Sequence, residues 1–227
     1  MRVKFFLRLI IFSLMFSPLA QANQEEITQK EAKIWAESKG QDLISTLAEP
    51  DMEKKYEKLD NLLVNDVDLE HLAKFVMGKY WRTMTPEQKE QYFPLFKRYS
   101  LALYKSFPIQ FKREDVDFTI TKVVTESLYA NIYANVELKK GITGEGAQKQ
   151  NFLVEFRVHR KNGKIMITDL KIAESSFLLA YRNRFTEMIA RNDGDIEWFL
   201  EDLEDITKSI EINNEKMLNE SLSIQPE

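Results

Sequence analysis

The sequence contains no cysteine and only two histidines among its 227 residues. The absence of cysteine excludes a disulfide framework, a thiol nucleophile and every zinc site that uses thiolate ligands. With only His71 and His159 present, a histidine-rich metal centre is not expected. The chain also lacks a glycine-rich phosphate loop, a GxSxG nucleophile elbow and an HExxH zinc motif. These absences give no support to an enzyme, and we expect no catalytic residue and no metal site.

The charge balance argues against nucleic acid as a partner, because 36 acidic residues outnumber 32 basic ones for a formal net charge of −4. The 44% content of hydrophobic residues is too high for a disordered chain. A chain of this length predicts one domain or two, and it buries enough surface to fold without a disulfide or metal.

Residues 1–22 have the pattern of a secretory signal peptide. Basic residues open the segment, an apolar stretch follows, and Ala20-Gln21-Ala22 supplies an A-x-A cleavage site. The apolar part after Arg8 is shorter than the ~20 residues that span a bilayer, so an uncleaved anchor is the weaker alternative. Cleavage removes three basic residues and leaves 29 against 36 acidic ones, a charge of −7. Because no cysteine is available for lipid attachment, we expect a soluble periplasmic protein that begins near Asn23.

The mature chain divides into helical and strand-like parts. Thr85-Pro86-Glu87-Gln88 predicts a helix start with a capping box, and Pro94 predicts a kink or a break in the helix that follows. Apolar residues recur at helical spacing over several stretches. These predicted helices are 24–47, 50–63, 68–80, 86–107, 177–190 and 196–210.

Four stretches between the helices alternate between apolar and polar residues and are rich in β-branched and aromatic side chains. They are 116–124, 128–138, 150–160 and 164–172, with Asn162-Gly163 as a hairpin turn between the last two. One apolar face and one mixed face are typical of an antiparallel sheet that is covered on one side. We therefore predict an α+β domain over residues 23–210, with helices packed on one face of a curved, mostly antiparallel sheet of about four strands. Residues 211–227 are polar and predict a frayed tail.

Acidic residues cluster at Asp66/Asp68 and at Glu114/Asp115/Asp117. Such groups can act in acid–base chemistry or bind a divalent ion. Because they flank predicted elements, helix capping and solvation are the favoured interpretation. The two histidines have no orienting partner in a motif, so surface or structural roles are favoured for both.

Residues 66–88, DVDLEHLAKFVMGKYWRTMTPEQ, resemble the MlaC-type family of periplasmic phospholipid carriers, also called the toluene-tolerance auxiliary family. The shared features are an aspartate-containing turn, the Val76–Trp81 segment and the TPEQ helix start, followed by aromatic positions from Tyr92 to Tyr104.

Three later segments are similar to the same family and extend the resemblance over residues 25–207. They are Asp169–Ser176, Tyr181–Phe185 and Asn192–Glu197. Ser175 and Asp193 depart from the family, which usually has glycine at these positions.

The resemblance implies a non-enzymatic shuttle. Its members carry phospholipid between an outer-membrane lipoprotein/porin complex and an inner-membrane ABC transporter complex, and so maintain outer-membrane lipid asymmetry. The implied fold is an NTF2-like cone with an apolar pocket. The implied ligand is phospholipid as cargo with no cofactor, and we expect a monomer.

Two periodicities predict which side chains line that pocket. Small residues at Ala130 and Ala134 on the apolar face of a strand leave room for a ligand, unless their neighbours fill the space. The predicted lining from the helices is Val76, Tyr80, Tyr99, Leu103 and Phe107, and from the sheet Ala130, Ile132, Ala134, Val136, Phe152, Val154 and Phe156.

Two other classes of function remain open from the sequence. A small-molecule enzyme on an NTF2-like scaffold would need an inward-facing acid or base, for which Asp169 is the best candidate. A lipoprotein chaperone or interaction protein would need no lipid of its own. Co-purifying phospholipid distinguishes the carrier from both.

Overall fold

The structure is a computed structural model that describes residues 26–107, 111–139 and 149–224; the predicted signal peptide lies outside these residues. The helices are α1 (Gln29–Leu47), α2 (Met52–Asp66), α3 (Leu69–Met77), α4 (Pro86–Lys105), α5 (Phe177–Arg191) and α6 (Ile196–Ile224), with 3₁₀ turns at Tyr80–Arg82 and Arg113–Asp115. The strands are β1 (Val116–Glu126), β2 (Tyr129–Leu138), β3 (Gln150–Lys161), β4 (Lys164–Ile172) and β5 (Ser175–Ser176).

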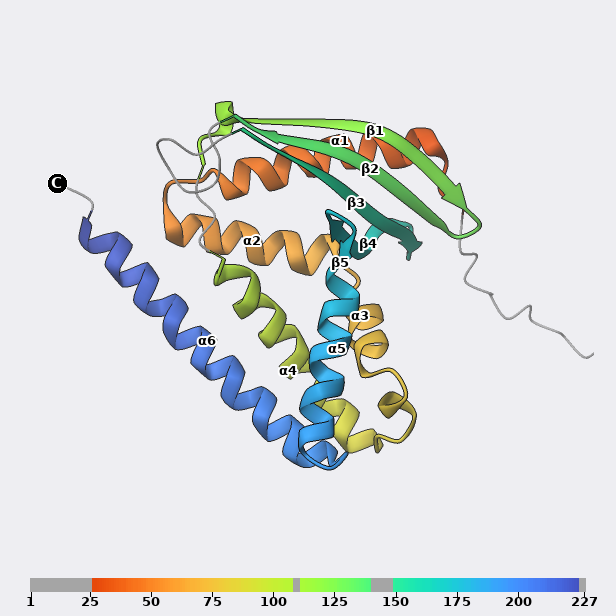
Figure 1. Ribbon diagram of the computed structural model, residues 1–227, viewed down its shortest axis with the longest axis vertical. Helices are drawn as coiled ribbons and strands as arrows, with labels where there is room; N and C mark the ends of the chain where they lie inside the picture. The colour runs from red at the N-terminus through yellow and green to blue at the C-terminus, as the bar shows by residue number, and fades with distance from the viewer. Residues whose placement is uncertain (1–25, 108–110, 140–148, 225–227) are drawn as a thin grey trace, which may run out of the picture.

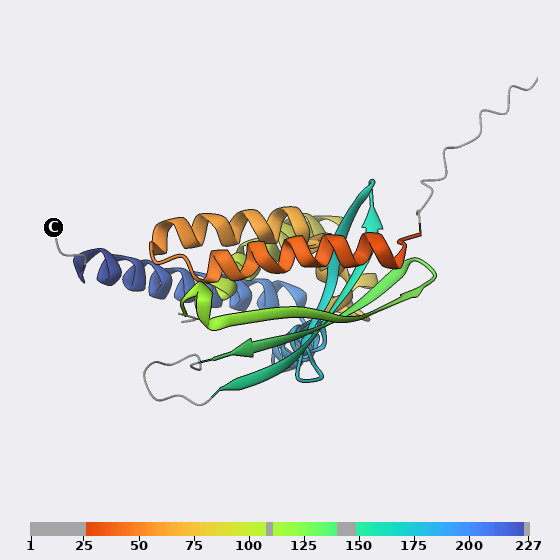
Figure 2. The ribbon, with the colours of Figure 1, turned by 90° about the horizontal axis from the view of Figure 1, so that it is seen from above.

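The strands form one antiparallel sheet in the order β1-β2-β3-β4-β5, which twists strongly across its width (Figures 1 and 2). The predicted α+β class, with helices packed on one face of the sheet, is confirmed. At the β3–β4 turn, Asn162 and Gly163 both have positive φ, as the Asn-Gly pair predicts. The sequence did not reveal β5, because two residues are too few to show an alternating pattern.

The inward face of the sheet is covered by α1. Ala130, Ile132 and Ala134 of β2 are fully buried, and they share a cluster with Ala32 and Ala36 of α1. Small residues on both surfaces allow the helix to lie close to the strands. The approach is closest at Gly40, where a Cβ atom would lie 2.3 Å from the Phe118 ring of β1.

The other helices form a second core below α1 (Figure 1). It contains the aromatic side chains of Tyr92, Phe96, Phe185 and Phe199, whose rings meet at tilted or edge-on angles. The hydroxyl of Tyr92 donates a hydrogen bond to the carbonyl oxygen of Ala73, 3.0 Å away. The aromatic positions of the predicted stripe in α4 therefore serve mainly as core.

Helix α4 begins as predicted and runs to Lys105 without a break at Pro94. Thr85 and Gln88 form the capping box. Pro94 lies inside the helix without splitting it in two. Proline removes one N–H donor, and the burial of Tyr92 before it and Phe96 after it favours a continuous helix.

Helix α6 corrects the predicted tail, because it runs through residues 211–224 instead of fraying at residue 210. Arg98 of α4 explains this extension: its guanidinium donates to Glu211 at 2.7 and 2.8 Å and to Glu204 at 3.0 Å. Further along, the Asn214 amide donates to the Ala102 carbonyl at 2.8 Å. These contacts join residues more than 100 positions apart, so the local composition of the tail could not reveal them.

Candidate functional site

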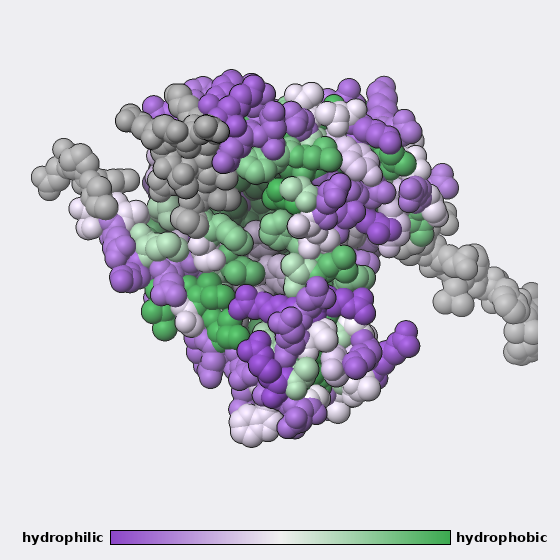
Figure 3. Space-filling view, in the orientation of Figure 1, coloured by the Kyte–Doolittle hydropathy of each residue, from purple (hydrophilic) through white to green (hydrophobic). Residues whose placement is uncertain are grey.

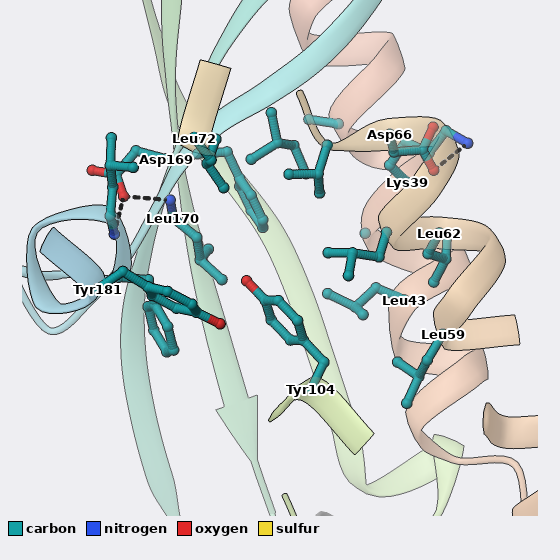
Figure 4. Close-up of a pocket in the computed structure, with 18 of the residues that line it drawn as sticks. Lys39, Leu43, Leu59, Leu62, Asp66, Leu72, Tyr104, Asp169, Leu170 and Tyr181 are labelled. Atoms are coloured by element: carbon teal, nitrogen blue, oxygen red, sulfur yellow. Dashed lines mark hydrogen bonds and ion pairs between the residues drawn. The ribbon is translucent and has the colours of Figure 1, made fainter. Parts of the chain in front are cut away.

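A cavity of about 130 Å³ lies between α1 and α2 on one side and β4, α4 and α5 on the other. Figure 3 shows the surface on this side of the molecule as a hollow with hydrophobic walls below the sheet. In Figure 4, leucines from α1 and α2 face Leu170 and the two tyrosines Tyr104 and Tyr181 across the space. The apolar part of the lining consists of Trp35, Ala36, Leu43, Leu59, Leu62, Leu63, Val67, Leu72, Val76, Phe96, Phe156, Ile167, Leu170, Phe177 and Leu178.

A second chamber of about 440 Å³ adjoins the first and extends toward the end of α6. Its far wall includes Met217 and Ser221, which lie in the part of α6 that the sequence predicted to fray. The residues that line both chambers are Leu43, Leu59, Tyr104, Leu170 and Phe177. The chambers therefore meet at a junction whose one hydroxyl-bearing side chain is Tyr104.

Only a few charged groups reach the first chamber. Lys39 of α1 and Asp66 of α2 form an ion pair of 2.9 Å at one edge of it (Figure 4). Asp169 at the end of β4 uses both carboxylate oxygens: Oδ1 accepts from the backbone N–H groups of Leu170 and Leu178, and Oδ2 accepts from the Ser176 hydroxyl at 2.7 Å. Asp169 and Ser176 thus connect the β4–β5 hairpin to the first turn of α5.

This arrangement bears on the enzyme interpretation, for which Asp169 was the best candidate. A general base needs a free lone pair directed at the substrate. Of the three hydrogen bonds of Asp169, two come from Ser176 and Leu178 at the start of α5 and one from the Leu170 N–H of β4. These hydrogen bonds also give a structural reason for the presence of Asp169 at one end of the Asp169–Ser176 segment and of Ser176 at the other. A structural role accounts for the carboxylate.

Tyr104 and Tyr181 bring hydroxyl groups into an otherwise apolar space. Both hydroxyls point into the cavity in Figure 4, from α4 and α5 respectively. Burial, together with the nearby Asp169 carboxylate, raises the pKa of Tyr104 to about 12. Burial and the neighbouring Tyr104 and Tyr99 raise the pKa of Tyr181 well above its usual range. Both phenols therefore stay neutral and can donate a hydrogen bond at any physiological pH.

The structure places three of the predicted lining residues in the cavity. Val76 and Phe156 line the first chamber, and Phe107 lines the second. The other nine predicted residues do not line either chamber. These nine are Tyr80, Tyr99, Leu103, Ala130, Ile132, Ala134, Val136, Phe152 and Val154.

The reason for this placement is packing. The predicted face of β2 and β3 points inward as expected, but α1 fills the space beneath it. Tyr99, Tyr80 and Leu103 pack in the core between the helices. The small residues Ala130 and Ala134 accommodate a helix, and the open space lies beyond that helix.

Several lining residues were missed by sequence reasoning. Leu43 and Leu59 belong to recognised helical stripes, so their spacing carried a signal for burial without showing what they face. Tyr104 was seen only as an aromatic position of the family resemblance. Leu170 of β4 and Tyr181 of α5 line the same chamber as residues of α1 and α2. This arrangement is set by tertiary contacts, for which the sequence carries no local signal.

A second polar cluster lies next to the cavity but outside its lining, where α3 meets the sheet. Asp68 is 3% exposed; its carboxylate caps α3 through the His71 N–H and contacts His159 Nε2 and Lys161 Nζ, both at 2.8 Å. Because a carboxylate only accepts, Nε2 of His159 is the donor. Burial alone would raise the pKa of Asp68, but the hydrogen bonds from His159, Lys161 and the His71 N–H hold it well below its usual range. The capping role favoured for Asp68 is confirmed.

No group of three or more His, Cys, Asp or Glu residues within the described ranges is arranged to hold a metal ion. None of the helices in the described part of the chain is both long and apolar enough to cross a membrane.

Comparison with known proteins identifies the family. No curated protein matches the sequence. A solved structure with the same fold is that of the phospholipid-binding protein from Ralstonia solanacearum in complex with a phospholipid; the TM-score is 0.60 at 16% identity, and the alignment covers 79% of this chain and 98% of that one. The sequence model of the family described as MlaC protein matches residues 37–205, which include the whole sheet, the core between the helices and most of the cavity wall. The chain therefore belongs to the MlaC protein family.

Proposed function

We propose that the protein binds phospholipid in the two-chamber cavity and carries it through the periplasm between an inner-membrane ABC transporter complex and an outer-membrane lipoprotein/porin complex. The observation that carries the proposal is an apolar cavity inside a fold of the MlaC family. The phospholipid in the related Ralstonia solanacearum structure supports the choice of ligand. Export follows from the predicted signal peptide at residues 1–22.

The energetics of lipid transfer require such a cavity. Burying an acyl chain contributes about 0.8 kcal/mol per CH₂, so two long chains represent roughly 20 kcal/mol against water. A carrier must therefore enclose the chains, and the chambers of about 130 and 440 Å³ together reach the size of typical ligand pockets. Transfer from a bilayer into an apolar cavity replaces one apolar surrounding with another and is close to neutral.

We propose a carrier without catalytic activity. Both oxygens of Asp169 are used in starting α5, and the other acid in the first chamber, Asp66, is paired with Lys39. Because both acids of the first chamber are occupied in this way, neither offers a general base to an ester-containing cargo there. No cofactor other than the lipid cargo is needed for this role.

The first prediction tests whether the cavity holds lipid. Leu59 lines both chambers, so Leu59→Trp places an indole at their junction and should remove most of the co-purifying phospholipid. Val64 lies on the same helix with an exposed side chain and outside both chambers, so Val64→Trp is the matched control and should bind like the wild type.

The measurement is native mass spectrometry of protein expressed in its host, with solvent extraction to identify the lipid. Wild-type protein should carry adducts of phospholipid mass. The proposal fails if the wild type carries no phospholipid. Equal occupancy in Leu59→Trp and Val64→Trp would show that lipid binds elsewhere, provided that circular dichroism finds both variants folded.

A further inference from the structure

Two tyrosine hydroxyls in the cavity lack the partners that buried hydroxyls normally have. Tyr104 and Tyr181 line the first chamber, and Tyr104 also lines the second. Among the described residues, neither hydroxyl has a hydrogen-bond partner, and both point into the space in Figure 4. Asp169 is the nearby acceptor, yet its oxygens are directed at the start of α5. Within the part of the chain that the structure describes, the first chamber therefore contains two phenol donors without an acceptor in the protein.

Such donors are unfavourable in an empty apolar site. A hydroxyl that leaves water without gaining a hydrogen bond destabilises the protein, and phenylalanine would fill the same volume without this cost. A ligand that brings an acceptor into the cavity offsets the cost only when it is bound. The two tyrosines thus favour a ligand that is apolar over most of its length and has hydrogen-bond acceptors at one place.

The location of the donors restricts which acceptors can reach them. Tyr104 lies at the junction of the chambers, and Tyr181 lines the first chamber beside it. A diacyl lipid with chains in the chambers brings its ester linkages to this level, because the ester carbonyls are the polar atoms attached directly to the chains. The phosphate is separated from the chains by the glycerol unit and does not enter an apolar site with them.

We propose that the hydroxyls of Tyr104 and Tyr181 donate hydrogen bonds to the ester carbonyl oxygens of a bound glycerolipid, so that the protein selects ester-linked over ether-linked lipids. This inference rests on the proposed function and names the part of the lipid that is recognised. The apolar walls bind any chain of suitable length, and the two hydroxyls distinguish the linkage. The raised pKa values keep both groups protonated as donors.

The test compares two phosphatidylethanolamines with identical chains, one with ester and one with ether linkages. Each is offered to delipidated protein, and competitive occupancy is measured by native mass spectrometry. A neutral hydrogen bond changes affinity roughly 2- to 10-fold. Wild-type protein should prefer the ester lipid by about this factor or more. Tyr104→Phe and Tyr181→Phe should each reduce the preference, and the double variant should bind both lipids equally.

Tyr99→Phe is the matched control. Tyr99 is buried on the same helix as Tyr104, and its hydroxyl also lacks a partner, but it lies outside both chambers. The control removes the same atom from the same kind of surroundings and should keep the wild-type preference. Thermal unfolding adds a second measurement. Although Tyr104→Phe and Tyr181→Phe should reduce the lipid preference, both lipid-free variants should unfold at the wild-type temperature or above it.

The outcomes separate the inference from the proposed function. Equal binding of both lipids by the wild type overturns the inference while the carrier function stands. A preference that persists in the double variant, or that disappears in Tyr99→Phe, overturns it as well. If the wild type binds neither lipid, the proposed function fails and the inference fails with it.

Discussion

At the scale of single residues, Asp68 shows how one buried carboxylate can join three elements. It caps α3, and it contacts His159 and Lys161 from β3. The backbone beside it also pairs with the sheet, since the Asp68 N–H donates to the Ile167 carbonyl of β4 at 2.9 Å. The turn between α2 and α3 is therefore fixed to the edge of the sheet, and this turn borders the cavity at Asp66 and Val67.

We predict that Asp68→Asn destabilises the protein by about 2 kcal/mol near pH 6, because the amide keeps the cap but loses the charge that faces Lys161 and His159. The pKa of Asp68 is lowered in the folded state. Its contribution is therefore fully present above the unfolded pKa of about 3.9 and is lost as the pH falls toward the folded pKa.

Urea denaturation at pH 6, 4 and 3 measures this effect. The difference between the wild type and Asp68→Asn should shrink steadily below about pH 4. Asp117→Asn is the control, because the Asp117 side chain is 58% exposed and its pairing with Lys139 should contribute little. A difference that stays constant down to pH 3 would contradict the assigned role.

The segment around Gly78 shows what a family motif can and cannot reveal. Gly78 ends α3 with φ 54° and ψ −122°, a conformation that strongly favours glycine. A Cβ atom there would lie 3.0 Å from the Arg182 guanidinium, which itself lies over the Phe75 ring. Two separate segments of the resemblance thus meet at one contact. The sequence identified both segments, but only the fold shows that they touch.

At the scale of elements, the contact between α1 and β1 depends on a glycine in the middle of a helix. Glycine costs about 1 kcal/mol relative to alanine at such a position. The Phe118 ring lies where the Cβ of any other residue would be, so we predict that Gly40→Ala destabilises the protein by about 1–2 kcal/mol despite its better helix propensity.

Thermal or urea unfolding tests this contact with two comparisons. Ser38→Ala at an exposed position of the same helix should be neutral or slightly stabilising. In a Phe118→Leu background, Gly40→Ala should cost less, since the ring that blocks the Cβ is gone. Equal costs in both backgrounds would show that the ring does not set the distance between helix and sheet.

Local patterns predicted the helices and strands well because they report which face of an element is buried. They did not show where the cavity lies, because they do not report what covers that face. The alternation of β2 and β3 follows from burial of one face, and it correctly placed Ile132 and Phe156 inward. The same alternation is silent on what covers that face. Ala130 and Ala134 are compatible with a ligand or with a close helix, and the choice depends on α1, about 100 residues earlier in the chain.

At the scale of the whole molecule, the cavity walls come from all six helices and from β3 and β4. Tyr104 and Tyr181 reach it from α4 and α5, and Met217 reaches it from the end of α6. The family match ends at residue 205, before Met217. The far wall of the second chamber thus belongs to a part of the chain that neither the local composition nor the family pattern described.

The proposed binding of phospholipid in this cavity predicts how the lipid would leave the protein. Because release of two chains into water is opposed by roughly 20 kcal/mol, bound phospholipid should remain through gel filtration in vesicle-free buffer. Transfer of a fluorescent phospholipid should need contact with an acceptor, so its rate should rise in proportion to the concentration of acceptor vesicles. A rate that does not depend on vesicle concentration would indicate release into water and would contradict the proposed transfer by contact.

The face of α1 that meets the sheet also limits how the binding volume can be redesigned. Ala32, Ala36 and Gly40 follow one another at four-residue intervals, and none of them has a side chain larger than a methyl group. Substitution on this side can only reduce the space or move the helix. The opposite wall has large side chains to trim, such as Leu59 and Leu62. Engineering the protein toward bulkier cargo should therefore begin on α2, with α1 left unchanged.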